Sequence, residues 1–136
     1  LGAKYREISR REVRWAGEDL EDAELVIVAY GTAARVARTA VARAREMGLR
    51  AGLFRPISLW PFPSDALAAI TASARAILVV ELSAGQMVED VRLAVEGRTP
   101  VLFHGRTGGM VPTPEGVVDA LRSAWALTPA RARGAR

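Results

Sequence analysis

A run of five apolar residues followed closely by a glycine is the feature that most constrains the fold of this chain. Leu25 to Ala29 include no polar residue and show no alternation, and Gly31 follows two positions later. An uninterrupted apolar strand is typical of the centre of a parallel sheet that is covered on both faces. Apolar residues then recur at helical spacing, so the stretch predicts a strand, a tight turn and a helix. A single glycine lacks the G-x-G-x-x-G pattern, so no pyrophosphate site is predicted.

Strands and helices alternate along the rest of the chain. Further strands are predicted at residues 49–54, 75–81 and 100–104, with a short extended stretch at 12–15 ahead of the first buried strand. Helices are predicted at 33–47, from residue 64 onward, at 83–97 and from residue 114 onward. Arg35, Arg38 and Arg45 fall opposite the apolar stripe of the first helix and predict a solvated face. The alternation favours a mostly parallel sheet covered by helices.

Length and composition predict one domain and exclude several functions. With 136 residues, half of them apolar, the chain can bury a single core. Apolar runs stay short of the ~18 residues of a membrane span, and residues 1–24 lack a signal-peptide pattern, so we expect a cytoplasmic protein without membrane partners. The absence of cysteine excludes iron-sulfur and thiolate-metal ligands within the chain. Part of the +4 charge lies in a basic tail, so we expect no nucleic-acid partner.

No residue pattern predicts a complete active site. His104 is the only histidine, and no cysteine or serine dyad accompanies it. A lone histidine at the end of a strand is more often a packed residue than a base or a metal ligand. We therefore predict no catalytic, cofactor-binding or metal-binding residues in this chain.

The segment 55–63, Arg-Pro-Ile-Ser-Leu-Trp-Pro-Phe-Pro, is predicted to be a loop and has two explanations. Three prolines stiffen a surface loop that nevertheless contains large apolar residues. The loop either folds back over its own core or forms a preformed apolar patch for another subunit or domain. Under the second explanation Arg55, Trp60 and Phe62 are candidate interface residues, and both aromatic side chains should be unusually exposed.

Four residues are predicted to border a crevice at the carboxyl ends of two central strands. If the strands at 24–30 and 75–81 are neighbours whose helices leave on opposite faces, the crevice gathers Gly31, Thr32, Glu81 and Gln86. Glu81 then either contacts a neighbouring domain or accepts hydrogen bonds from backbone N–H groups where the next helix begins. Ser83 and Gln86 have capping-box spacing at that helix start.

A glycine-rich loop follows the last predicted strand. Arg106, Gly108 and Gly109 precede a helix start, and this combination can hold a phosphate or a carboxylate. Glycines also serve simply to turn the chain. Both explanations stay open for this loop.

Several of these motifs, in this order and spacing, resemble the carboxyl-terminal domain of the alpha subunit of 2-oxoacid:ferredoxin oxidoreductases. The resemblance covers residues 22–125 and rests on segments 29–31, 55–63, 79–81, 85–92, 105–109 and 112–114, although Ser83 stands where that family favours asparagine. It implies a three-layer α/β/α sandwich with a five-stranded, mostly parallel mixed sheet of the transketolase C-terminal type. Residues 1–21 are then a linker with an edge strand, 22–127 the domain, and 128–136 a disordered basic tail.

The resemblance also implies a function for the complete enzyme, which oxidatively decarboxylates a 2-oxo acid to an acyl-coenzyme A and reduces ferredoxin. Its cofactors are thiamine diphosphate, magnesium, iron-sulfur clusters and coenzyme A, none of them expected in this chain. The implied partners are the amino-terminal thiamine-enzyme domain of the alpha subunit, the beta, gamma and delta subunits, and ferredoxin. This chain is then a structural and assembly domain. Two alternatives stay open: a stand-alone module that binds a nucleotide or coenzyme A, and the equivalent domain of a transketolase or E1-beta-like enzyme.

Overall fold

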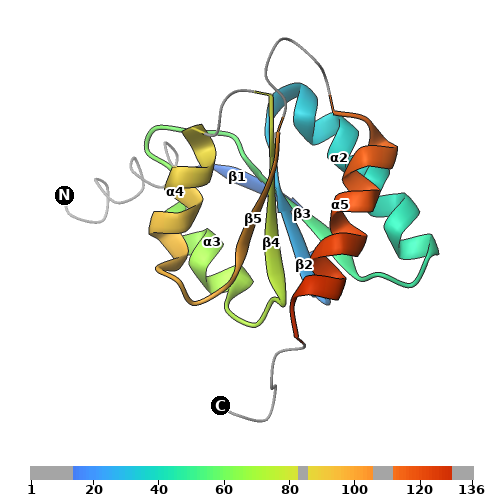
Figure 1. Cartoon of the computed structure of the whole chain (residues 1–136). Coiled ribbons are helices and arrows are strands. Elements are labelled where there is room, and N and C mark those ends of the chain that lie inside the picture. The colour runs from blue at the N-terminus through green and yellow to red at the C-terminus, as the bar shows by residue number, and fades with distance from the viewer. Residues whose placement is uncertain (1–13, 83–85, 106–111, 130–136) are drawn as a thin grey trace, which may run out of the picture.

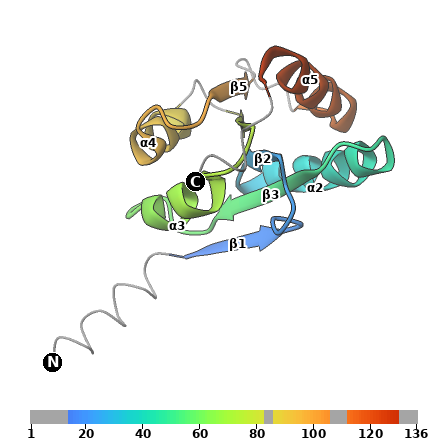
Figure 2. The same ribbon diagram turned by 90° about the horizontal axis from the view of Figure 1, so that it is seen from below.

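A computed structural model describes residues 14–82, 86–105 and 112–129 of the chain. Within these ranges the strands are β1 (Trp15–Glu18), β2 (Leu25–Val28), β3 (Ala51–Pro56), β4 (Ala76–Glu81) and β5 (Val101–Gly105). The helices are α2 (Gly31–Glu46), α3 (Ser64–Thr71), α4 (Gln86–Val95) and α5 (Pro114–Leu127). Figures 1 and 2 show the helices on both sides of a single sheet.

The sheet has the strand order β1-β3-β2-β4-β5. β1 runs antiparallel to β3, and the other neighbouring strands are parallel. α2 and α5 cover one face, whereas α3 and α4 cover the other (Figure 2). This arrangement confirms the predicted three-layer α/β/α sandwich with a mostly parallel mixed sheet.

The two faces of the sheet pack into cores of different composition. On the α2 side the helix contributes small side chains: Ala33, Ala34, Ala37, Ala40, Val41 and Ala44. Alanine lets this helix lie close to the sheet. The opposite face uses larger residues, among them Phe54, Leu67 and Met87, each 3% exposed or less. Strands β2 and β4 are buried along their whole length because helices cover them on both faces.

Two helix ends follow the signals in the sequence. Gly48 lies just beyond the end of α2 with a φ of +87°, a backbone conformation that glycine adopts without steric cost. Thr113 caps α5, because its hydroxyl oxygen accepts a hydrogen bond of 3.0 Å from the backbone N–H of Gly116. Pro114 then occupies the first helical position, where its missing N–H carries no cost.

The edge strand β1 lies later in the sequence than predicted. Residues 12 and 13 are outside the described ranges, and Gly17, which we expected to follow the strand, pairs with Phe54 of β3 inside it. A Cβ at Gly17 would lie 2.5 Å from the side chain of Leu20, so a glycine suits this position.

The strand β3 continues further than predicted. Arg55 and Pro56, which we assigned to the loop, pair with β1, so the loop begins at Ile57. Pro56 lies beyond Phe54, the last residue of β3 that pairs with β2, so β3 is paired on one side only at the proline, as an edge strand is.

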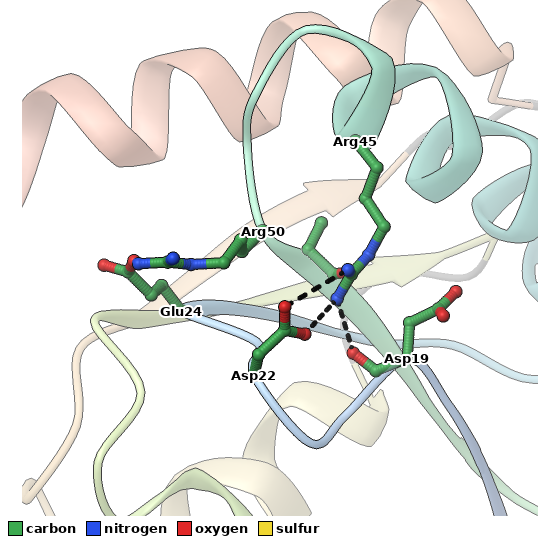
Figure 3. Close-up of polar contacts among 6 residues, drawn as sticks. Asp19, Asp22, Glu24, Arg45 and Arg50 are labelled. Atoms are coloured by element: carbon green, nitrogen blue, oxygen red, sulfur yellow. Dashed lines mark hydrogen bonds and ion pairs between the residues drawn. The ribbon is translucent and has the colours of Figure 1, made fainter.

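The segment between β1 and β2 is fastened to the sheet at the amino ends of the parallel strands (Figure 3). Arg45 of α2 donates hydrogen bonds of 2.8 Å to the carbonyl oxygens of Asp19 and Ala51, and one of 2.7 Å to the Asp22 carboxylate. The bond between the side chains lowers the pKa of Asp22 and raises the pKa of Arg45. Glu24 forms an ion pair with Arg50 next to this contact.

The predicted solvated face of α2 holds for Arg35 and Arg38, which are exposed, and is wrong for Arg45. Arg45 is half-buried, and Arg38 reaches across to Glu18 of β1, with the two charged groups 2.6 Å apart. Arg35 is exposed as predicted. Helical spacing shows which residues point away from the core, but not which of them meet another segment.

The described chain enters and leaves the sheet at opposite ends. Trp15 pairs with Pro56, at the carboxyl end of β3. Arg75, just before β4, donates a hydrogen bond of 2.7 Å to the carbonyl oxygen of Trp125 and lies 3.8 Å from the centre of its ring. Thr128, expected to begin a disordered tail, is instead 7% exposed.

Candidate functional site

The predicted site residues that the structure describes lie at the carboxyl ends of the parallel strands. The carboxyl ends of the parallel neighbours β2, β3 and β4 lie at this end of the sheet (Figure 1). Strands β2 and β4 are parallel neighbours, and their helices α2 and α4 leave on opposite faces. In doubly wound sheets a crevice forms between two neighbouring strands whose helices lie on opposite faces. The predicted crevice required this arrangement of β2 and β4.

Gly31 and Thr32 are exposed at the start of α2. Gly31 has a φ of +60°, and apart from its chain neighbours and the backbone of α2 no atom lies within 4 Å of where its Cβ would be. The preceding residue, Tyr30, makes no side-chain hydrogen bond to the first turn. A side chain at position 31 would fit the space but would strain the backbone at this positive φ. The backbone conformation is therefore the reason for a glycine at this position.

Glu81 takes the second of its two predicted roles. Its side chain is 0% exposed, and its carboxylate accepts hydrogen bonds from the backbone N–H groups of Met87 at 2.8 Å and Val88 at 3.3 Å. These are N–H groups of the first turn of α4, which otherwise lack partners within the helix. Ser83 lies outside the described residues, so the predicted capping box is not seen there. Gln86 is the exposed first residue of α4.

The loop after β3 presents its tryptophan to solvent. Trp60 is 93% exposed, as we expected for an interface residue. Phe62 differs from the prediction, because it is only partly exposed and packs against the core on the α3 and α4 side.

Two further residues of this loop and one residue of β1 are also large, apolar and partly exposed. Ile57 is 51% exposed, Leu59 39% and Trp15 39%. Trp15 stacks on Phe54, with the ring centres 4.9 Å apart and the planes 9° from parallel. We call Trp15, Ile57, Leu59 and Trp60 the aromatic surface.

Hydrogen bonds hold the two segments of the aromatic surface together. The carbonyl oxygen of Arg14 accepts from the backbone N–H groups of Ile57 at 3.0 Å and Ser58 at 3.2 Å. The Ser58 hydroxyl oxygen accepts from the backbone N–H of Arg14 at 2.9 Å, and the hydroxyl donates to the carbonyl oxygen of Pro61 at 3.0 Å. The loop therefore has a defined conformation in the isolated chain.

Arg55 is half-buried, and its Nε has no hydrogen-bond partner among the described residues. Arg106, Gly108 and Gly109 lie outside the described residues, so anion binding by that loop stays a prediction. His104 lies against the first turn of α5, with its Nε2 3.6 Å from the position of a Cβ on Gly116.

The described ranges contain no group of three or more histidine or acidic side chains that could hold a metal ion. Two shallow hollows of about 320 and 450 Å³ lie at the opposite end of the sheet, around 92–101 and 68–72. Neither hollow includes a predicted site residue. The same described part of the chain has no helix long and apolar enough to cross a membrane.

Trp15, Ile57 and Leu59 were not predicted from the sequence as candidate interface residues. Ile57 and Leu59 belong to the loop that we singled out, and their size could have marked them. Trp15 has no such signal, because its place beside the loop depends on the pairing of β1 with β3.

Comparisons with known proteins agree on one family. The family model for the pyruvate:ferredoxin oxidoreductase core domain II matches residues 23–117. The ketoisovalerate oxidoreductase subunit VorB of Methanothermobacter thermautotrophicus is 43% identical over 122 residues, which are 90% of this chain and 34% of that subunit. The 2-oxoglutarate synthase subunit KorA of Methanocaldococcus jannaschii is 35% identical over 112 residues, covering 82% of this chain and 30% of KorA. The chain thus spans about a third of these relatives.

Two solved structures share the fold. A 2-oxoglutarate:ferredoxin oxidoreductase from Magnetococcus marinus, with 2-oxoglutarate, coenzyme A and succinyl-CoA bound, matches with a TM-score of 0.76 and 24% identity over 88% of this chain and 21% of that chain. A split-gene transketolase, an inactive beta4 tetramer, matches with a TM-score of 0.72 and 22% identity over 84% of this chain and 42% of that chain. Both identities are low, so these matches support the fold alone.

Proposed function

Because this chain belongs to the pyruvate:ferredoxin oxidoreductase core domain II family, we propose that it serves as a structural and assembly domain of a 2-oxoacid:ferredoxin oxidoreductase subunit. The complete enzyme would oxidatively decarboxylate a 2-oxo acid to an acyl-coenzyme A and pass the electrons to ferredoxin. The observation that carries this proposal is the family match over most of the folded chain. The similarity to VorB and KorA subunits supports it.

The cofactors of such an enzyme would be held outside this chain. Iron-sulfur clusters need cysteine thiolates, and the sequence has no cysteine. A magnesium ion beside thiamine diphosphate needs oxygen ligands, and the described residues offer no cluster of carboxylates. The cysteine-free sequence does not fit iron-sulfur clusters and the described residues do not fit a magnesium ion, so we assign this chain no chemical step.

The partners follow from the same proposal. They are the amino-terminal thiamine-enzyme domain of the alpha subunit, the beta subunit, the gamma and delta subunits, and ferredoxin for the complete enzyme. The cytoplasm is the expected location. Two alternatives make different predictions: a stand-alone module would bind a nucleotide or coenzyme A by itself, whereas a transketolase-like domain would support no ferredoxin reduction.

The experiment compares the chain alone with the complete assembly. Isothermal titration of the 136-residue chain with thiamine diphosphate and magnesium should show no binding. The complete subunit, produced from its whole reading frame with the other subunits, should reduce ferredoxin when a 2-oxo acid and coenzyme A are supplied. Deleting residues 22–127 should prevent assembly. Stoichiometric cofactor binding to the chain alone, or saturable coenzyme A binding, would contradict the proposal.

A further inference from the structure

We propose that two copies of this chain associate through the outer edge of β5, with their β5 strands paired antiparallel about a two-fold axis at Phe103. The two sheets would then form one continuous sheet across the dimer. This inference does not depend on the proposed function, because it follows from the edge of the sheet alone.

The outer edge of β5 has no strand beside it in the described part of the chain. β5 stands last in the strand order. Figures 1 and 2 show it as the outermost strand, with α4 on one face and α5 on the other. All six residues of β4 are buried, whereas every residue of β5 is half-buried or exposed. The helices therefore cover the two faces near β5 and leave its edge accessible.

The backbone groups of this edge point in a defined direction. The N–H of Ile77 in β4 donates a hydrogen bond of 2.9 Å to the carbonyl oxygen of Pro100. In a parallel ladder every second residue bonds to the same neighbour, so Pro100 and every second residue after it face β4. The residues between them direct their N–H and C=O groups away from the sheet. These residues are Val101, Phe103 and Gly105.

β5 lacks the features that usually prevent an exposed edge from pairing. Natural edge strands are commonly protected by charged side chains, by proline or by a bulge. The sequence of β5, Val-Leu-Phe-His-Gly, contains no acidic residue, lysine, arginine or proline. Its five residues pair with five successive residues of β4, so the strand has no bulge. The other edge strand, β1, is shorter and contains Glu18.

Antiparallel pairing centred on Phe103 satisfies all the outward groups. Residues directly opposite each other exchange two hydrogen bonds at every second position of an antiparallel pair. With Phe103 opposite its counterpart, Val101 of each copy lies opposite Gly105 of the other, which gives about six hydrogen bonds. An edge of this length and register is matched by a second copy of itself.

The side chains of the edge support the same centre. Val101 packs on the α4 side of the sheet, and Phe103, two residues later, points to the same side. Phe103 is 41% exposed. Two such rings facing each other across the axis form an aromatic cross-strand pair. A Cβ at Gly105 would overlap the ring of Phe103, so the ring lies over Gly105, where Val101 of the second copy would contact it.

The charges beside the edge are complementary between two copies. Arg92 of α4 lines the hollow that also includes Val101, which places it next to β5. Arg92 forms an ion pair of 3.5 Å with Glu89, one turn earlier in the helix. A two-fold axis reverses this order in the second copy, so Glu89 of each copy would approach Arg92 of the other. A second copy therefore meets the backbone, the aromatic ring and the charges of this edge.

Disulfide cross-linking tests the position of the axis. The sequence has no cysteine, so an introduced cysteine has only its counterpart to react with. In Phe103→Cys the two residues would face each other with Cα atoms about 5.5 Å apart, which a disulfide can bridge. Mild oxidation of the 136-residue chain should therefore give a covalent dimer.

Val101→Cys is the matched control on the same strand. Its two cysteines would lie roughly 13 Å apart along the paired strands, too far for a disulfide. Phe103→Cys should cross-link faster by about tenfold or more. Equal rates for the two variants would overturn the proposed pairing.

Sedimentation equilibrium of the 136-residue chain tests the association itself. Phe103→Glu would place two carboxylates at the axis and should raise the dissociation constant by about 100-fold or more. Trp60→Glu, at an aromatic residue that is 93% exposed near the other edge of the sheet, should leave the constant unchanged. Urea titration shows that each variant is folded before the constants are compared. A wild-type chain that stays monomeric, or a dimer that Trp60→Glu dissociates and Phe103→Glu does not, would overturn the inference.

Discussion

The two ends of the parallel strands differ in their side-chain contacts. Polar groups at the amino ends bind other residues of the chain, whereas a large apolar side chain at the carboxyl ends stays exposed. At the amino ends, Arg45 binds a carboxylate and two carbonyl oxygens, and Glu24 pairs with Arg50. At the carboxyl ends, Glu81 is buried as a helix cap, but the adjacent loop leaves Trp60 93% exposed. The charged side chains at the amino end are thus paired with one another. The carboxyl end combines a buried helix cap with an apolar surface that no described residue covers.

This difference separates residues that hold the fold from residues that are available to other molecules. A buried carboxylate or a bridging guanidinium contributes to the stability of the chain itself. An exposed tryptophan contributes almost nothing to that stability, because it loses little contact with water on folding. Four substitutions test the distinction.

We expect the largest effect from Glu81→Ala. The change removes two hydrogen bonds to buried N–H groups and leaves a cavity, which should lower the free energy of unfolding by about 3 kcal/mol. Urea titration of the 136-residue chain measures it. Glu89→Ala, an exposed carboxylate of the same helix, is the control and should change little. A loss below about 1 kcal/mol for Glu81→Ala would mean that the carboxylate does not organise this end of the sheet.

Arg45→Ala should have an intermediate effect at the amino end. The guanidinium bridges the carbonyl oxygens of Asp19 and Ala51, so its removal should cost about 1.5 kcal/mol in unfolding free energy. Arg35→Ala, an exposed arginine of the same helix, should be nearly neutral. If the two variants unfold at the same urea concentration, the hydrogen bonds of Arg45 do not stabilise the amino ends of the strands.

Asp22→Asn should change how stability depends on pH. The hydrogen bond from Arg45 lowers the pKa of Asp22 below its ordinary value of 3.8. The stabilisation is therefore complete above that value and is lost as the pH falls through the lower pKa of the folded state. Urea midpoints at pH 7 and about pH 2.5 should differ less in the variant than in the wild type. Asp65→Asn, an exposed carboxylate of α3, serves as the comparison and should retain the full difference.

Trp60→Ala should have the smallest effect on the isolated chain. With 93% of the side chain in water, the free energy of unfolding should change by less than about 0.5 kcal/mol. The control is Trp125→Ala, because the ring of Trp125 lies under Arg75. This substitution should lower the free energy of unfolding by clearly more, which would show that the assay detects the loss of a packed tryptophan. A loss of roughly 3 kcal/mol for Trp60→Ala would show that the loop caps its own core and would remove the contrast between the two ends.

The sequence predicted the parts of the fold that depend on neighbours along the chain. The apolar run at β2, Gly48 after α2 and the Thr113-Pro114 cap are local patterns, and the structure has each where it was expected. The predicted crevice required strands β2 and β4 to be neighbours, and the structure meets this condition.

The differences arose where two distant segments meet. Gly17 lies inside β1 because β3 offers it a partner, and Phe62 turns inward because the core beneath α3 accommodates it. Arg45 acquired its three acceptors from two other segments. No spacing within one helix can reveal such partners, so the sequence predicted which strand ends carry the candidate residues but not what each of them contacts.

The placement of the chain's entry and exit has a consequence for how this domain can be joined to others. The described chain enters beside Pro56, at the carboxyl end of the sheet, and leaves beside Arg75, at the amino end. Domains that are inserted into a loop of a host usually have ends that lie close together. This domain does not meet that requirement, so it is suited to tandem connection, in which one neighbour attaches at each end of the strands. Labels joined at Arg14 and at Pro129, the first and last described residues, would therefore lie at opposite ends of the sheet.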